Sequence, residues 1–218
     1  MRVASMGGRQ MNLVKDSLTE QIYGLIKERI ITQEYELGQK IDTNEIAENN
    51  NISVMPVRDA LNSLEDDGLV TKKSRVGYFV RVFSKKEAED IMEARKMYEI
   101  YSVESYFSEF NLDFLQDLHG KMLELQNNMS RDEFDELDYE FHQHIINISG
   151  NDYIIKNYNQ INEMIQLFRR LDKDRMEEAN CEHMEIIDFI VRQKLEKSKK
   201  SLNNHIEKVK RSLLQNLK

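Results

Sequence analysis

Four polar side chains interrupt the apolar stripes of predicted helices in the second half of the sequence. Asp138 and His142 are four residues apart, so both face the apolar side of one helix, one turn from each other. His183 precedes an apolar stripe on a later helix, and His205 lies on the stripe of the last one. A buried carboxylate and buried imidazoles are costly unless they are paired. A divalent metal ion would satisfy all four, and the spacing of Asp138 and His142 follows the logic of helical metal motifs.

Hydrogen bonding within the core could account for the same residues without a metal. A single histidine on an apolar stripe is more often a core residue with a hydrogen-bond partner, and an Asp138–His142 hydrogen bond would explain that pair. If a metal is bound, zinc is the first choice, with nickel or manganese as alternatives, because imidazole and carboxylate suit all three. The ion could be structural, could itself be the signal, could bind a small organic acid at its open positions, or could activate water as in a metalloenzyme.

Arg95 is the candidate to pair with the far end of such an acid. It lies on the same predicted helix face as Tyr98 and Ser102, and that face is expected to turn inward. The alternative is a buried ion pair with a carboxylate of the protein itself. Arg169 and Arg170 are expected to be surface or interface charges, and no role is assigned to them.

The first third of the sequence predicts three short helices and a hairpin. Ser17 caps the first helix and Glu20 completes a capping box. Thr43 is expected to cap the second, and Ser53 opens the third, which ends at Gly68. Residues 69–82, LVTKKSRVGYFVRV, read as two strands around a basic turn. This order is typical of a winged helix-turn-helix, whose third helix enters the major groove of DNA.

Basic residues lie where such a domain would meet DNA. Arg58 is expected on the solvent side of the third helix, and the hairpin carries Lys72, Lys73, Arg75 and Arg81. The alternative is a small structural domain whose charges are merely solvated. The pattern favours binding to double-stranded DNA.

Composition agrees with a mainly helical protein. The chain has 218 residues, one Pro, eight Gly, and a net charge of −8. Residues 1–82 carry 11 Lys/Arg and 12 Asp/Glu, whereas residues 83–218 carry 20 and 27, so the acidity belongs to the second part. A single cysteine, Cys181, excludes an internal disulfide and a multi-cysteine zinc module. The sequence has neither a leader nor a long apolar run, so a cytoplasmic protein without membrane contact is expected.

Four regions are predicted from these patterns. Residues 1–11 are expected to be a disordered tail, 12–82 a winged helix-turn-helix, 83–87 a linker, and 88–218 an antiparallel all-α bundle of about six helices.

The first region resembles the GntR family of regulators. The stretch ISVMPVRDALNSLEDDGLV at 52–70 is similar to the family signature, and VGYFV at 76–80 to its wing. The resemblance implies that Arg58 contacts DNA from the third helix, that Ser53 and Met55 lie at neighbouring contact positions, and that Gly77 enters the minor groove.

The sequence departs from the GntR pattern at three positions. The family usually has Arg where this chain has Val54, a small hydroxyl where it has Met55, and often Arg where it has Asn44. Because Arg pairs with guanine in two hydrogen bonds, its loss removes about 1–3 kcal/mol of discrimination. We therefore expect a more A·T-rich operator, with Val54 and Met55 touching thymine methyl groups.

The second region resembles the FCD effector domain that accompanies FadR-type GntR regulators. Residues 136–151, ELDYEFHQHIINISGN, and 183–206 are similar to its metal-binding segments. The resemblance implies that Asp138, His142, His183 and His205 are the metal ligands and that Arg95 lies near the effector. Six helices suggest the shorter, VanR-like branch. The implied protein is a homodimeric repressor, not an enzyme, which binds a pseudo-palindromic operator under the control of a small organic acid.

Overall fold

The structure, a computed structural model, describes residues 17–172 and 175–217, so the tail expected at residues 1–11 lies outside the described residues. The N-terminal domain has the three helices that the sequence predicts and a small sheet. Its elements are α1 (Leu18–Ile31), β1 (Lys40–Ile41), α2 (Thr43–Asn49), α3 (Val54–Asp66), β2 (Val70–Lys73) and β3 (Gly77–Val80).

Local capping explains where the first helices begin. The capping box of Ser17 and Glu20 at the start of α1 is confirmed. The prediction for α2 is wrong by one residue, because Asp42 is the cap and Thr43 is the first helical residue. The Asp42 carboxylate accepts the N–H groups of Asn44 at 2.8 Å and Glu45 at 3.2 Å.

The wing is a sheet of three strands rather than a bare hairpin. β3 pairs antiparallel with β2 on one side and with β1 on the other. β1 is only two residues long, too short for a periodic pattern to reveal it in the sequence. It ties the segment between α1 and α2 to the wing. Buried Ile26, Leu61, Leu64 and Val80 lie in the core of this domain.

Six α-helices in the described residues form the C-terminal domain, which confirms the predicted bundle. They are α4 (Lys85–Ser105), α5 (Leu112–Leu125), α6 (Arg131–Asn147), α7 (Asp152–Leu171), α8 (Met176–Val191) and α9 (Leu195–Asn216), with a 3₁₀ turn at Phe107–Glu109. The predicted linker is shorter than expected, since a capping box of Ser84 and Glu87 starts α4 at Lys85.

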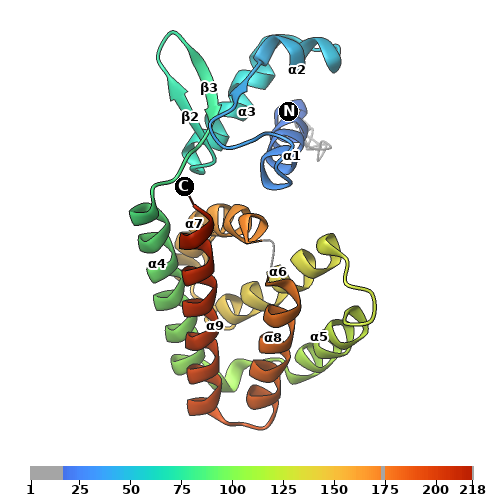
Figure 1. Ribbon diagram of the computed structural model, residues 1–218, viewed down its shortest axis with the longest axis vertical. Helices are drawn as coiled ribbons and strands as arrows, with labels where there is room; N and C mark the ends of the chain where they lie inside the picture. The colour runs from blue at the N-terminus through green and yellow to red at the C-terminus, as the bar shows by residue number, and fades with distance from the viewer. Residues whose placement is uncertain (1–16, 173–174, 218) are drawn as a thin grey trace, which may run out of the picture.

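The winged domain lies on one end of the bundle (Figure 1), near the start of α4 and the end of α9, which run antiparallel beside each other. Helix α7 contributes several side-chain contacts between the two parts. Glu163 pairs with Lys27 of α1 at 2.5 Å, and the Met164 sulfur lies 3.9 Å from an Arg81 nitrogen. Phe168 packs edge-on against Phe83, with ring centroids 4.9 Å apart. A movement of α7 would therefore shift its contacts with the winged domain.

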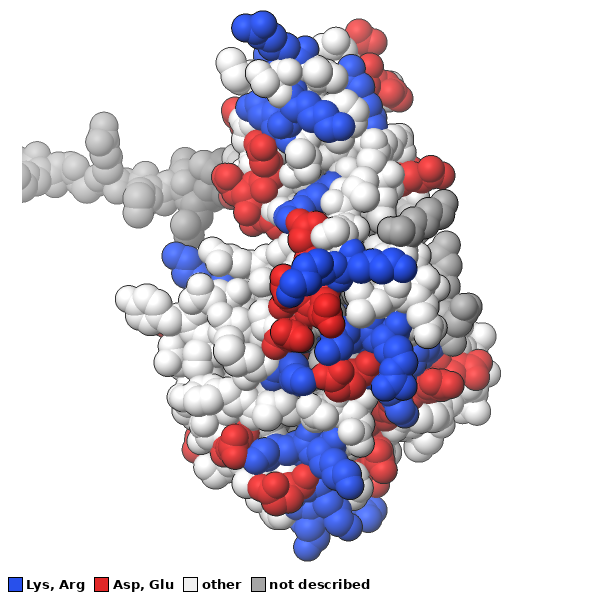
Figure 2. Space-filling view, turned by 60° about the vertical axis from the view of Figure 1, so that its left-hand side comes forward, with Lys and Arg blue, Asp and Glu red and all other residues white. Residues whose placement is uncertain are grey.

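Charge is distributed differently over the two parts of the molecule. Figure 2 shows a group of Lys and Arg at the tip of the winged end, with Asp and Glu to either side of it, and over the bundle Lys and Arg lie next to Asp and Glu. None of the helices in the described part of the chain is long and apolar enough to cross a membrane.

Candidate functional site

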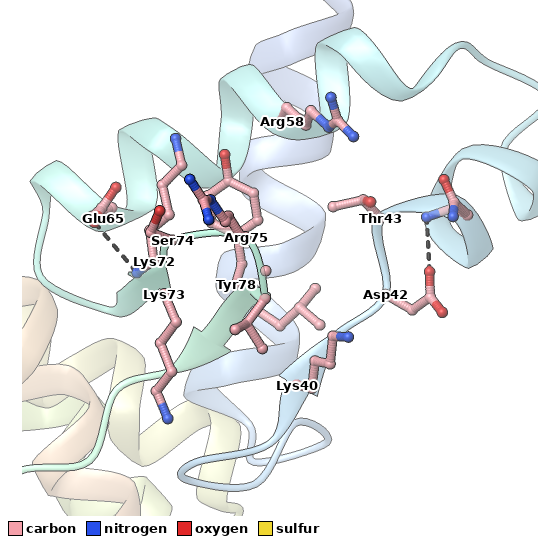
Figure 3. A pocket seen from close by; sticks show the side chains of 14 residues that line it. Lys40, Asp42, Thr43, Arg58, Glu65, Lys72, Lys73, Ser74, Arg75 and Tyr78 are labelled. Atoms are coloured by element: carbon pink, nitrogen blue, oxygen red, sulfur yellow. Dashed lines mark hydrogen bonds between the residues drawn. The ribbon is translucent and has the colours of Figure 1, made fainter.

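A cationic groove lies between the wing and the two helices that precede it (Figure 3). It has a volume of about 690 Å³. Five cations line it: Lys40, Arg58, Lys72, Lys73 and Arg75. Apart from Lys40, these are cations that the sequence predicts to meet DNA. Cations beside an open groove are the arrangement that phosphate contacts require.

The third helix presents its predicted contact residues at its exposed start. Ser53 is the N-cap, and within the described part of the chain its hydroxyl makes no capping hydrogen bond. Met55 is 66% exposed, and Arg58 is exposed on the same helix and lines the groove. Val54 is half-buried and packs against the domain core, so Met55 is the better placed of the two apolar residues to touch a base.

The wing residues diverge because successive side chains of a strand point to opposite faces. Lys72 reaches back to the third helix, where its ammonium donates to the Asn62 side chain at 3.0 Å. Lys73 lies over the ring of Phe79 on the other face. Arg75 and Gly77, both with positive φ (62° and 130°), shape the tip.

Two residues of this surface were not predicted from the sequence. Lys40 comes from the short β1 strand, and its side chain lies against the backbone of Gly77. Asn62 holds the wing to the third helix, because its side-chain oxygen accepts from Lys72 and, at 2.8 Å, from the Tyr78 hydroxyl. Lys40 gave no signal, since the sequence does not show that β1 joins the wing.

Three histidines from three helices converge in the core of the bundle. His142 of α6, His183 of α8 and His205 of α9 are each at most 2% exposed. The Nε2 atom of His183 lies 3.2 Å from those of both His142 and His205. Burial lowers the pKa of His142 and His183 well below the ordinary value, so both are neutral at pH 7.

Carboxylates behind two of the histidines fix which nitrogen faces the centre. The Nδ1 atom of His142 lies 2.8 Å from Glu99, and the Nδ1 atom of His205 lies 2.8 Å from Glu182. A carboxylate can only accept here, so both Nδ1 atoms carry a proton. In a neutral ring that tautomer leaves a lone pair on the Nε2 atom that faces the centre. Neither glutamate was singled out from the sequence.

This donor set fits a cation. The single proton that Nε2 of His183 can carry is able to hydrogen-bond to one neighbouring lone pair only. With three neutral rings, at least one other nitrogen lone pair faces the centre without a proton, which is unfavourable in a buried site. A divalent ion bound among the three Nε2 atoms removes that repulsion and uses all three as ligands.

Asp138, the fourth predicted ligand, lies beside the histidines but has another partner. One of its oxygens is 3.6 Å from Nε2 of His183 and 4.0 Å from Nε2 of His142, and the other pairs with Arg169 at 2.6 Å. Although burial raises the pKa of the Asp138 carboxyl, the charge of Arg169 brings it below its usual value. Arg169, expected to be a surface or interface charge, does not lie on the open surface, because its side chain is 11% exposed and pairs with the buried Asp138 of α6.

Arg95 is buried, as expected, and uses only part of its guanidinium. Its Nε atom donates to Glu99 at 2.7 Å, so the predicted ion pair with a bundle carboxylate is present. Its Nη2 atom has no hydrogen-bond partner among the described residues. The arginine borders a cavity of about 20 Å³, room for roughly one water molecule. Further residues around this cavity include Asp138, Arg169, Arg175, His205, Phe168 and Met92.

Comparison with known proteins agrees with this architecture. Residues 18–80 match the family model "Bacterial regulatory proteins, gntR family", and residues 90–208 match the FCD domain. The Nta operon transcriptional regulator of Aminobacter aminovorans is 26% identical over 180 residues, 82% of this chain and 86% of that protein.

Two solved structures are similar as well. A GntR transcriptional regulator from Rhodococcus sp. RHA1 has a TM-score of 0.79 at 18% identity, covering 90% of this chain and 97% of that one. The Zn²⁺-bound FCD domain of TM0439 has a TM-score of 0.58 at 29% identity, covering 62% of this chain and 97% of that one.

The two family matches account for both halves of the molecule. The GntR match covers the winged domain with its cationic groove, and the FCD match covers the bundle with its histidine cluster and more than half of the 218 residues. Proteins with these domains are transcriptional regulators, so the metalloenzyme considered from the sequence is not supported. The chain belongs to the GntR family of bacterial regulators, in the group that carries an FCD domain, and is a DNA-binding transcriptional regulator.

Proposed function

We propose that this regulator is a homodimeric, cytoplasmic repressor whose operator affinity is controlled by a small organic acid bound at a metal site in the bundle. The observation that carries the proposal is the convergence of three buried Nε2 atoms beside a cavity bordered by Arg95, in the same chain as the cationic groove. The Zn²⁺-bound FCD domain of TM0439 supports a divalent ion, with zinc as the first choice.

On the DNA side, two copies related by a two-fold axis would place two α3 helices on the half-sites of a pseudo-palindromic operator. Arg58 and Met55 then face the bases, with Ser53 and Asn44 at the edge of the contact. Lys72, Lys73, Arg75 and Gly77 of the wing follow the backbone and the minor groove. A repressor acts by occupying such an operator where it overlaps a promoter.

On the sensing side, His142, His183, His205 and Asp138 would hold the ion. A bound ion would supply open coordination positions for a carboxylate, and the buried Nη2 group of Arg95, which has no partner among the described residues, would pair with the rest of the acid. The adjoining cavity of about 20 Å³ is too small for an organic acid. The acid therefore enters only if side chains such as Arg169 or Phe168 move.

Helix α7 is the route by which that movement reaches DNA. It carries Arg169 and Phe168 at the cavity, and on neighbouring turns Glu163 and Met164 at the winged domain. An acid that binds one arrangement of α7 better than another shifts the population of the two, by as much as its affinities differ.

Operator affinity of three forms of the protein tests the proposal. The metal-free, Zn²⁺-loaded and Zn²⁺-plus-acid forms would be titrated against operator DNA at fixed salt, with citrate and lactate as the first acids. We expect an acid to change the affinity only when the ion is bound. If all three forms bind the operator with equal affinity, and the two loaded forms do contain Zn²⁺, the metal has a purely structural role.

Selection of binding sites from random DNA tests the specificity part separately. The exposed Met55 and the missing arginines at positions 44 and 54 predict A·T-rich half-sites. Recovery of G-rich half-sites contradicts this. Native mass spectrometry of the freshly purified protein would report the dimer and its bound ion together.

A further inference from the structure

The three histidines of the cluster differ in what contacts the Nδ1 atom on the side away from the centre. His142 has the fully buried Glu99 at its Nδ1 atom, and His205 has the half-buried Glu182. Nδ1 of His183 has no hydrogen-bond partner in the part of the chain that the structure describes. The orientation and tautomer of the three rings are thus not equally constrained. The residue that contacts Nδ1 determines how strongly each ring is held.

Glu99 is the centre of a hydrogen-bond network that joins three helices. One of its oxygens accepts two hydrogen bonds, from Arg95 Nε at 2.7 Å and from the Tyr158 hydroxyl at 2.8 Å. Its other oxygen faces Nδ1 of His142. A fully buried carboxylate is tolerated because it accepts three hydrogen bonds, one of them from a cation. Both of its oxygens are thus engaged by residues of α4, α6 and α7.

We propose that Glu99 is a positioning residue that fixes the tautomer of His142, and through that tautomer sets the affinity of the cluster for a divalent ion. The proposal rests on the metal-dependent function proposed above. Glu182 does the same for His205 from the bundle surface, where water can replace part of its contribution. Partners behind metal-binding histidines are known to set ligand orientation and basicity.

Replacement of Glu99 by Gln separates charge from shape at this position. The amide oxygen stays with Arg95 and Tyr158, because two donors converge there. The amide nitrogen then faces His142 and donates to Nδ1, which must accept. The ring proton moves to Nε2, and the lone pair that would bind the ion is lost. Gln has nearly the same volume as Glu, so packing is little changed.

Nuclear magnetic resonance of metal-free protein labelled with ¹⁵N at histidine tests the tautomer directly. In the unaltered chain we expect Nδ1 of His142 to carry the proton, and in Glu99→Gln we expect Nε2 to carry it. A loss of packing alone would not exchange the two nitrogens. Protonation of Nε2 in the unaltered chain overturns the proposal without any variant.

Zn²⁺ affinity, measured by competition with a coloured chelator, tests the consequence. Glu99→Gln should weaken binding by about 10–100-fold, and Glu182→Gln should weaken it less. Glu185→Gln is the matched control, because Glu185 lies on α8 near Glu182 and, among the described residues, accepts a hydrogen bond from Ser201 rather than from a histidine of the cluster. If Glu99→Gln does not fold, Glu182→Gln with unchanged affinity and an unchanged His205 tautomer contradicts the proposal.

The two proposals fail in different ways. If the unaltered chain binds no Zn²⁺, the sensing part of the proposed function is wrong, and this inference is wrong with it. If the unaltered chain binds Zn²⁺ and folded Glu99→Gln binds it equally well, only the role of Glu99 is wrong.

Discussion

The winged end and the centre of the bundle use charge in opposite ways. At the winged end, Arg58 and Arg75 lie in an open groove and have no ion-pair partner within the described residues. In the bundle, Glu99, Asp138 and Arg95 are buried, and each is paired with a side chain of the protein. Charges left free on a surface are available to a large charged partner such as DNA. Charges buried in pairs hold a small site in one geometry, and removal of one partner leaves the other charge buried and unpaired.

This contrast predicts the largest effect at the buried site. His205→Ala removes one of three converging nitrogens, so Zn²⁺ affinity should fall further than in Glu99→Gln. For that variant, which changes a residue behind a ligand, the expected loss is about 10–100-fold. Elemental analysis after dialysis measures the ion content. His119→Ala is the control, because His119 lies partly exposed on α5 outside the cluster. Full zinc content in His205→Ala would refute the site.

The next effect belongs to the open groove. Arg58→Ala should weaken operator binding by about 1–3 kcal/mol, because it removes a direct contact from the third helix. The bundle should keep its thermal stability and its zinc content, since no side chain of the protein pairs with Arg58 among the described residues. A titration at fixed salt measures the affinity, and an unchanged value contradicts the assigned contact.

A smaller effect sharpens the distinction between phosphate and base contacts. Lys73→Ala should lower affinity for every DNA sequence alike and reduce the slope of log affinity against log salt by about one. Lys121→Ala, on α5 and paired with Asp117, serves as the control and should leave the slope unchanged. If Lys73→Ala changes sequence preference instead, the wing reads bases.

The smallest effect lies between the two regions, at the start of α4. Hydrogen bonds from Ser84 and from Arg81 lower the pKa of Glu87 from 4.5 to about 2. A carboxyl whose pKa is lowered by folding stabilises the fold above its unfolded pKa, and that contribution is lost as pH falls from about 4.5 to 2. Urea unfolding should show Glu87→Gln less stable than the unaltered chain at pH 7, and no longer so near pH 2. A difference that persists unchanged at that pH would mean that the charge of Glu87 is not the cause.

Sequence periodicity was sufficient to predict that the side chains of the candidate ligands face the core. Asp138 and His142 lie one turn apart on an apolar face, and His183 and His205 lie on two other apolar faces, so all four are buried. The same reasoning placed Arg95 inward. The contact of Arg169 with Asp138 was not predicted, because the position of α7 against α6 decides which side of that helix is covered.

The partners of these residues could not be predicted from spacing. Glu99 left one signal, a charged residue one turn after Arg95 on an inward face, but its bond to His142 joins residues 43 positions apart. Glu182 lies next to His183 in the sequence and yet supports His205 of another helix. Helical periodicity specifies the face on which a residue lies and contains no information on what meets that face.

The sequence alone determined the two domains, the caps Ser17 and Ser53, the exposed Arg58 of the third helix with the basic wing, and the burial of the four candidate metal ligands, because all of these depend on residues within a few turns of each other. Only the tertiary structure decided that Lys40 joins the wing, that Arg169 pairs with Asp138, and that carboxylates lie behind His142 and His205. These contacts depend on how separate helices and strands pack, and that packing is set by the whole core rather than by any local pattern.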